Sequence, residues 1–164
     1  MDDNTFKEAL RQWVAGVTIV TTRVGDQIQG MTASSFTSVS INPHLILIAV
    51  DDKTRSQPLI SESGIFAANI LHTGQIEWAK RFAGMYPEIT DRFFDIDYTT
   101  ATTGAPILPG VIGWVDCKVY GEHKAGDHTI FVGEVIDAQG SGGEPPLLYY
   151  SRQWGHFSAV PEEN

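Results

Sequence analysis

Two cations and two hydroxyl groups stand together at the start of a predicted helix: Lys53, Thr54, Arg55 and Ser56. The backbone N–H groups in the first turn of a helix have no partner within the helix, and together with the helix dipole they attract anions. Arginine adds charge-assisted hydrogen bonds to phosphate oxygens. The cluster therefore predicts a phosphate-binding turn, with an ordinary capped surface turn as the alternative.

A second polar feature is a run of small hydroxyl residues at 30–40, which reads Gly-Met-Thr-Ala-Ser-Ser-Phe-Thr-Ser-Val-Ser. Its neighbours are apolar, and hydroxyl groups that become buried require hydrogen-bond partners. A ribbon of hydroxyl and backbone groups suits the edge of a flat heterocycle or a ribityl chain. The alternative is an exposed edge strand rich in serine and threonine.

A histidine, His128, follows Gly126 and Asp127 at the expected tip of a long hairpin, where an imidazole can face a ligand in a cleft. A solvated surface histidine is the alternative. The other histidines lack the spacing of metal ligands, and the chain has a single cysteine, so we predict no metal site. That cysteine, Cys117, falls on the apolar face of its strand and is interpreted as a packing residue.

The overall charge limits the class of partner. Eleven Lys and Arg against 20 Asp and Glu leave a net charge of −9, which disfavours nucleic acid. We expect a single domain over residues 1–164, because this length suits one core and no internal repeat or linker is recognisable. The content of 42% hydrophobic and 19% charged residues is typical of a globular protein. No apolar run reaches the ~20 residues of a membrane span, no secretory signal is recognisable, and one cysteine is compatible with a reducing cytoplasm.

The expected helices are short and few. Apolar residues at helical spacing follow a capping box at Thr5–Glu8 and predict an opening helix: Phe6, Ala9, Leu10 and Trp13. A second helix is expected to be capped by Thr54 and to end before Gly64. A third is expected to be capped by Thr73 and to end before Pro87.

Strands are predicted by β-branched or alternating segments at 17–24, 27–31, 45–50, 65–71, 111–122, 128–138 and 147–150, and a further strand is expected in the hydroxyl-rich segment at 32–40. Turns at Gly25 and Gly126 indicate antiparallel hairpins. The stretch from Thr99 to Pro109 is expected to be a long surface connection, and residues from Val160 to Asn164 a frayed tail. These elements predict a mainly β, antiparallel barrel with short helices rather than a doubly wound α/β sheet.

Five motifs run in a fixed order along the chain: G-M-T-A-S-S-F-T-S-V-S at 30–40, N-P-x-L-I-L-I at 42–48, D-x-K-T-R-S at 51–56, A-G-D-H-T-I-F-V-G-E-V at 125–135 and P-L-L-Y-Y at 146–150. Together they closely resemble the flavin reductase family, the FMN-binding split-barrel proteins that serve as reductase components of two-component flavin monooxygenases. The resemblance covers residues 6–157. It implies a homodimeric antiparallel split β-barrel that reduces FMN or FAD with NADH or NADPH and passes the reduced flavin to a separate oxygenase.

The resemblance also assigns site residues. The pyrimidine edge and the N5 side of the isoalloxazine would meet Thr32, Ala33, Ser34 and Ser35. The ribityl chain would follow Ser38, Val39 and Ser40. The phosphate would be held by Lys53, Thr54, Arg55 and Ser56. Many relatives carry Asn where this chain has Ser34, so that contact would come from a shorter side chain or from the backbone.

For the reaction itself, the resemblance implies that His128 lies over the flavin face, where the nicotinamide stacks, with Phe82 in the flavin neighbourhood. No protein nucleophile is needed, because the hydride passes directly between the two cofactors. Two alternatives remain: a flavin carrier or store on the same barrel, and a flavin-dependent reductase of a ferric chelate or a corrin. The sequence leaves open FMN or FAD, NADH or NADPH, and the identity of the oxygenase.

Overall fold

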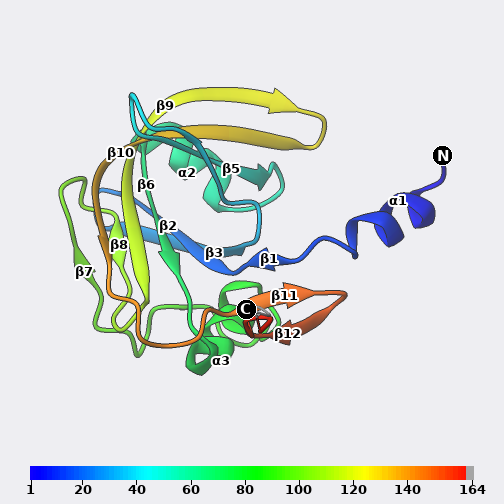
Figure 1. Ribbon diagram of the computed structural model, residues 1–164. Coiled ribbons are helices and arrows are strands. Elements are labelled where there is room, and N and C mark those ends of the chain that lie inside the picture. The colour runs from blue at the N-terminus through cyan, green and yellow to red at the C-terminus, as the bar shows by residue number, and fades with distance from the viewer. Residues whose placement is uncertain (162–164) are drawn as a thin grey trace.

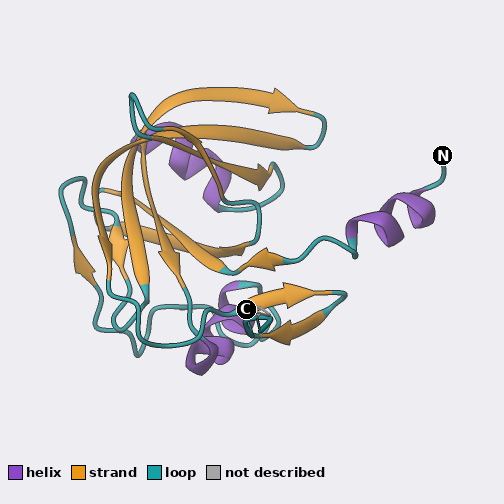
Figure 2. Cartoon of the chain, in the orientation of Figure 1, coloured by secondary structure: helices purple, strands orange, loops and turns teal. Residues whose placement is uncertain are grey.

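The computed structural model describes residues 1–161 and contains a strongly curved antiparallel sheet with short helices around it (Figures 1 and 2). Residues 162–164 of the expected tail lie outside this description. The predicted mainly β architecture with few helices is confirmed. Within residues 1–161, no helix has the length and apolar character needed to cross a membrane.

The central sheet has seven strands, and each adjacent pair is antiparallel. Its strands in chain order are β2 (Thr18–Val24), β3 (Gln27–Ala33), β4 (Thr37–Ser40), β5 (Leu45–Asp51), β6 (Ile65–Ile70), β9 (Gly113–Ala125) and β10 (His128–Gly140). In space their order is β3-β2-β6-β9-β10-β5-β4. The consecutive strands β3 and β4 are thus the two edges of the sheet, which curls into a barrel with an open seam.

The remaining elements lie outside this sheet. The helices are α1 (Asp3–Leu10), α2 (Ser56–Ser63) and α3 (Ile76–Phe82), with the short 3-10 turn η1 (Thr73–Gln75) before α3. One small sheet contains β1 (Ala15–Gly16), β11 (Leu148–Tyr150) and β12 (Gln153–Gly155). Another pairs β7 (Thr99–Thr100) with β8 (Pro106–Ile107).

Apolar side chains fill both faces of the curved sheet. Inside the curve, Phe66, Phe131 and Cys117 pack with Ile60 of α2, and Figure 2 shows this helix within the curve. On the outer face, another cluster includes Ile19 and the α3 residue Phe82. The prediction that Cys117 is a packing residue is confirmed, and burial raises the pKa of its thiol to about 12.

The segment at 99–109 differs from the expected surface connection. Ala105, Ile107 and Leu108 are buried. The carbonyl oxygen of Pro106 accepts hydrogen bonds from the side chains of Thr21 and Asn69, at 2.5 and 3.4 Å. The prediction was wrong because partners distant in the sequence satisfy the backbone of this Gly/Pro-rich stretch, which allows it to enter the core.

Helix α1 begins earlier than expected and buries none of its residues against the rest of the described chain. Its N-cap is Asp2, whose carboxylate accepts the backbone N–H of Thr5 at 2.8 Å, so the predicted capping box at Thr5 is incorrect. None of its residues is buried. The apolar residues Phe6, Leu10 and Trp13 are exposed, and Figure 1 shows α1 extending away from the barrel.

Gly133 is required by the packing of β10 on the interior of the barrel. A Cβ there would lie 2.5 Å from Cζ of Phe66 and 2.9 Å from Cβ of Cys117, both fully buried. We expect Gly133→Ala to lower the free energy of unfolding by about 2 kcal/mol, because overpacking forces the core to shift. The measurement is urea unfolding. Gly140→Ala on the same strand meets nothing within 4 Å and is the control; an equal loss in both variants would contradict the packing argument.

Candidate functional site

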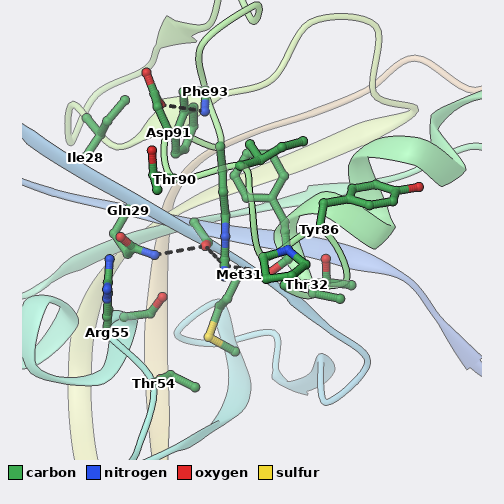
Figure 3. Close-up of a pocket in the computed structure, with 18 of the residues that line it drawn as sticks. Ile28, Gln29, Met31, Thr32, Thr54, Arg55, Tyr86, Thr90, Asp91 and Phe93 are labelled. Carbon is green, nitrogen blue, oxygen red and sulfur yellow. Dashed lines mark hydrogen bonds between the residues drawn. The ribbon is translucent and has the colours of Figure 1, made fainter.

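A pocket of about 480 Å³ lies between β3, the turn after β5 and the segment after α3 (Figure 3). Its size is within the usual range of small-molecule sites. Six residues predicted from the sequence line it: Thr32, Lys53, Thr54, Arg55, Ser56 and Phe82. The fold therefore brings the phosphate cluster, one hydroxyl side chain of the ribbon and the aromatic candidate to one cavity.

A tight turn positions the cationic cluster at the end of β5. The carboxylate of Asp51 accepts a hydrogen bond from the backbone N–H of Lys53 at 2.8 Å. The carbonyl oxygen of Asp51 accepts two more from Thr54, one from its backbone N–H at 3.0 Å and one from its hydroxyl at 2.8 Å. Helix α2 then begins at Ser56 with Arg55 in the N-cap position and no capping side chain. The expected cap by Thr54 is thus incorrect, and the N–H groups of the first turn stay available to a ligand.

The side chains of this turn fit an anionic ligand. Ser56 is 2% exposed, and its hydroxyl is buried with no hydrogen-bond partner within residues 1–161, although such a group normally has one. Lys53 and Arg55 are exposed, and neither forms an ion pair in the same range. A phosphate at this position would give the Ser56 hydroxyl an acceptor and would neutralise both cations.

The opposite part of the lining was missed by the sequence analysis. It comes from residues 83–93, which have no helical or strand periodicity, and it includes Tyr86, Asp91 and Arg92. In Figure 3, Tyr86 and Thr32 lie on one side of the cavity and Arg55 on the other. The only available signal for Arg92 was that basic residues are scarce in a chain of net charge −9.

Phe82 forms part of the wall and of the core at once. A Cβ on Gly30 would lie 2.5 Å from Cε1 of Phe82, so the ring packs directly against the backbone of β3. The ring also meets Phe93 edge to face, with ring centroids 4.9 Å apart. These contacts hold the segment after α3 against β3 and keep this wall of the pocket rigid.

The predicted hydroxyl ribbon divides at the end of β3. Thr32 faces the pocket and donates its hydroxyl to the carbonyl of Ala79 at 2.6 Å, whereas Ala33 is buried. Ser34 lines a second pocket beneath α1, which also measures about 480 Å³ and includes Trp13. The Ser35 hydroxyl donates to the Ala49 carbonyl at 2.9 Å and accepts its N–H at 3.1 Å, which ties the β3–β4 connection to β5.

The three predicted ribityl contacts lie on the edge strand β4, away from the first pocket. Ser38 and Ser40 line a shallow third pocket together with His44 and Ile136, and Val39 is half exposed. Ser38 and Ser40 pair with Ile46 and Leu45 at the start of β5, whereas the phosphate cluster follows Asp51 at the end of that strand, so they do not converge with the cluster within one chain.

His128 lies beside the cationic turn, although it does not line the pocket. It is the first residue of β10, directly opposite Asp51 in the strand register. Its Nδ1 is 2.7 Å from the carboxylate of Asp127, and this hydrogen bond lowers the pKa of Asp127. The imidazole side chain is 43% exposed. The ring is therefore anchored through Nδ1, while Nε2 stays available.

Asp52 fastens this hairpin tip to the turn. Its backbone N–H donates to the carbonyl of Asp127 at 3.1 Å. Its carboxylate lies 2.6 Å from Nζ of Lys124 and accepts the Thr129 hydroxyl at 2.7 Å. The hydrogen bond from Lys124 has the largest effect and that from Thr129 the next, and both lower the pKa of Asp52. The tip that carries His128 is thus held next to the predicted phosphate turn.

The chain is similar to known proteins in both sequence and structure. The flavin reductase like domain matches residues 10–158. A flavin reductase of Pseudomonas putida is 36% identical over 161 residues, which cover 98% of this chain and 93% of the relative. The reductase subunit HsaB of a flavin-dependent monooxygenase of Rhodococcus jostii (strain RHA1) is 35% identical over 154 residues, or 94% of this chain and 77% of the relative.

A solved structure matches the whole architecture. The NADH:FAD oxidoreductase SgcE6 of Streptomyces globisporus C-1027, in complex with NAD and FAD fragments, has a TM-score of 0.89 at 31% identity. The match covers 98% of this chain and 96% of that one. The predicted split-barrel fold is therefore confirmed, and this chain belongs to the flavin reductase like domain family.

Proposed function

We propose that this chain is an NADH-dependent flavin reductase that reduces FMN or FAD and supplies the reduced flavin to a separate monooxygenase. The observation that carries the proposal is the uncapped start of α2 at a pocket of about 480 Å³. Within residues 1–161, Lys53 and Arg55 form no ion pair there, and the hydroxyl of Ser56 has no hydrogen-bond partner. This arrangement suits the phosphate of a flavin nucleotide. The reaction, reduction of a flavin by NADH, is proposed from the names of the relatives described above.

In this proposal the turn after β5 holds the flavin phosphate through Lys53, Thr54, Arg55 and Ser56. When bound, the flavin supplies the redox chemistry by accepting a hydride from the nicotinamide. His128 presents Nε2 beside that turn and orients the nicotinamide, with Asp127 fixing the ring through Nδ1. Phe82 forms the adjoining wall.

The hydroxyl ribbon keeps its proposed roles. Contacts with the isoalloxazine are assigned to Thr32, Ala33, Ser34 and Ser35, and contacts with the ribityl chain to Ser38, Val39 and Ser40. In a single chain Thr32, Ser34 and the pair Ser38 and Ser40 line three different pockets, Ala33 is buried, and Ser35 and Val39 line none of these pockets. A second copy of the chain beside the first would supply the missing walls of such a site.

We therefore also propose a homodimer. The exposed apolar residues Phe6, Leu10 and Trp13 on and after α1, together with Val39 and Ile41 near the seam of the barrel, support it. Exposed apolar side chains grouped in this way are typical of protein interfaces. Light scattering is expected to give twice the mass of one chain.

A reducing cytoplasm is our proposed location, because a single buried cysteine suits it.

The experiment that tests the function is steady-state oxidation of NADH with free FMN or FAD in large excess over the protein. A reductase consumes NADH through many turnovers in proportion to the free flavin present. Consumption that stops after one equivalent per protein would indicate a carrier or store instead. Turnover that needs a ferric chelate or a corrin, and not free flavin, would identify a different acceptor. Repeating the assay with NADPH establishes the preferred hydride donor.

A further inference from the structure

The tip of the β9–β10 hairpin carries His128, and apolar packing does not hold this tip in place. Residues 122–127 are all exposed. Figure 1 shows the hairpin projecting beyond the rest of the barrel. Within residues 1–161, the side chain that bonds to the His128 imidazole is that of Asp127, which is itself exposed. The position of the ring therefore depends on the polar contacts of the tip.

These contacts meet at Asp52, the first residue after β5. Its backbone N–H donates to the carbonyl of Asp127, the residue before His128, at 3.1 Å. Its carboxylate accepts the hydroxyl of Thr129, the residue after His128, at 2.7 Å. The other carboxylate oxygen is 2.6 Å from Nζ of Lys124, which lies opposite Thr129 in the strand register. Asp52 thus binds the hairpin on both sides of His128.

One of these contacts is shielded from water. Thr129 is buried and Asp52 is largely covered, so removal of the carboxylate leaves the buried hydroxyl without its acceptor. Lys124 is exposed, and an exposed ion pair contributes little to stability. The hydrogen bond to Thr129 is therefore the stronger anchor of the tip.

Few other side-chain contacts tie this part of the hairpin to the barrel. Within residues 1–161, the side chains of 122–129 form hydrogen bonds or ion pairs outside the hairpin with two residues, Asp52 and Ser61. The Ser61 hydroxyl donates to the carboxylate of Glu122 at 2.8 Å, six residues before His128. Asp52 is therefore the side chain that ties down the tip itself.

The neighbouring carboxylate of Asp51 has a different task. It accepts the backbone N–H of Lys53 at 2.8 Å and so shapes the proposed phosphate turn. Asp51 is also opposite His128 in the strand register. Two consecutive residues at the end of β5 thus fix the turn and the hairpin tip against each other.

We propose that Asp52 is a positioning residue, which holds His128 beside the phosphate turn and thereby sets KM for NADH. The proposal rests on the proposed function and deepens it, because it names what aligns the hydride donor. Asp52 does not line the pocket at the turn, so it acts through His128. Its substitution is therefore expected to change the use of NADH without changing the affinity for the flavin.

The experiment measures KM for NADH and the dissociation constant of FMN with the whole protein. We expect Asp52→Ala to raise KM at least about fivefold and to change FMN binding less than about twofold. Asp52→Asn is expected to recover part of the loss, because its side-chain oxygen still accepts the Thr129 hydroxyl. In a His128→Ala background, Asp52→Ala is expected to change KM less than about twofold, since one residue acts through the other.

Glu122→Ala is the matched control. It also removes a carboxylate that ties the hairpin to another element, since Glu122 accepts the hydroxyl of Ser61 on α2. We expect this variant to keep KM for NADH within about twofold of wild type. A rise as large as that in Asp52→Ala would attribute the effect to a loosened hairpin and would overturn the proposal.

Three further results would also overturn the proposal: an unchanged KM in Asp52→Ala, equal losses of NADH and FMN, and a full effect of Asp52→Ala in the His128→Ala background. If Asp52→Ala does not fold, Thr129→Val removes the same hydrogen bond from the side of the hairpin. This variant is expected to raise KM at least about twofold, and an unchanged KM would count against the proposal in the same way.

A spectroscopic measurement separates the proposal from the proposed function. If the wild-type protein oxidises no NADH in the presence of flavin, the proposed function fails, while the position of His128 is still tested by nuclear magnetic resonance. The Cε1–H signal of His128, assigned by its loss in His128→Ala, must shift or broaden in Asp52→Ala and stay in place in Glu122→Ala. A signal that Asp52→Ala leaves unmoved would overturn the positioning role.

Discussion

Replacing Lys53 and Arg55 together with alanine is expected to raise the dissociation constant of FMN about 100-fold, and that of riboflavin less than about threefold. Both side chains line the pocket at the uncapped start of α2, and only FMN has a phosphate for them to meet. Each charge-assisted hydrogen bond contributes about 1.5–3 kcal/mol, and the exposure of these two residues places them at the lower end of that range. Fluorescence titration with the two ligands measures the difference.

A variant distant from the pocket separates local contacts from the overall charge. Lys118→Ala also removes an exposed cation, but Lys118 does not line this pocket. It is expected to leave the affinities for both ligands within about twofold of wild type, since screening limits the effect of distant surface charges. Equal losses of FMN and riboflavin in the Lys53 and Arg55 variant would refute the phosphate assignment.

Replacing His128 with alanine is expected to slow flavin reduction at least about tenfold and to raise KM for NADH, with flavin binding nearly unchanged. The imidazole is anchored to Asp127 through Nδ1, and the backbone N–H of Asp52 holds the hairpin tip beside the phosphate turn. It thus lies beside the proposed phosphate turn without lining the pocket itself. Stopped-flow reduction over a range of NADH concentrations measures both quantities.

His123→Ala is the control for this variant. His123 is an exposed histidine on the same hairpin, five residues before His128 and outside the cationic turn. It is expected to reduce flavin at the wild-type rate. If His128→Ala also keeps the wild-type rate and KM, then His128 has no part in binding the nicotinamide.

Local signals predicted much of the fold. The two long hairpins were expected from turn glycines, and both Gly25 and Gly126 adopt the positive φ that such turns require. The end of the second helix was likewise predicted by Gly64, which has a φ of +66° and donates its N–H to Ile60. In each case the information lies within a few residues of the element concerned.

What could not be predicted depends on partners far away in the sequence. The burial of 105–108 requires Thr21 and Asn69, which hydrogen-bond to Pro106 across separations of 85 and 37 residues. Nothing in the composition of that stretch indicates such partners. The interior position of α2 is similar, because it depends on the curvature of the whole sheet.

The candidate site follows the same rule. The cationic turn was predictable because its four residues are consecutive and begin a helix. Arg92 was not, because residues 83–93 have no periodicity and are folded onto β3 by the packing of Phe82 and Phe93. The sequence also did not predict that Thr32 and Ser34 line different pockets, because this separation arises where β3 ends at the seam of the barrel.

The most direct test of the central claim is the visible absorbance of free flavin during anaerobic addition of NADH to a catalytic amount of the protein. The account predicts that the flavin band of excess FMN or FAD is lost completely, at a rate proportional to the protein concentration. Flavin that binds to the protein but is never bleached by NADH or NADPH would contradict the account.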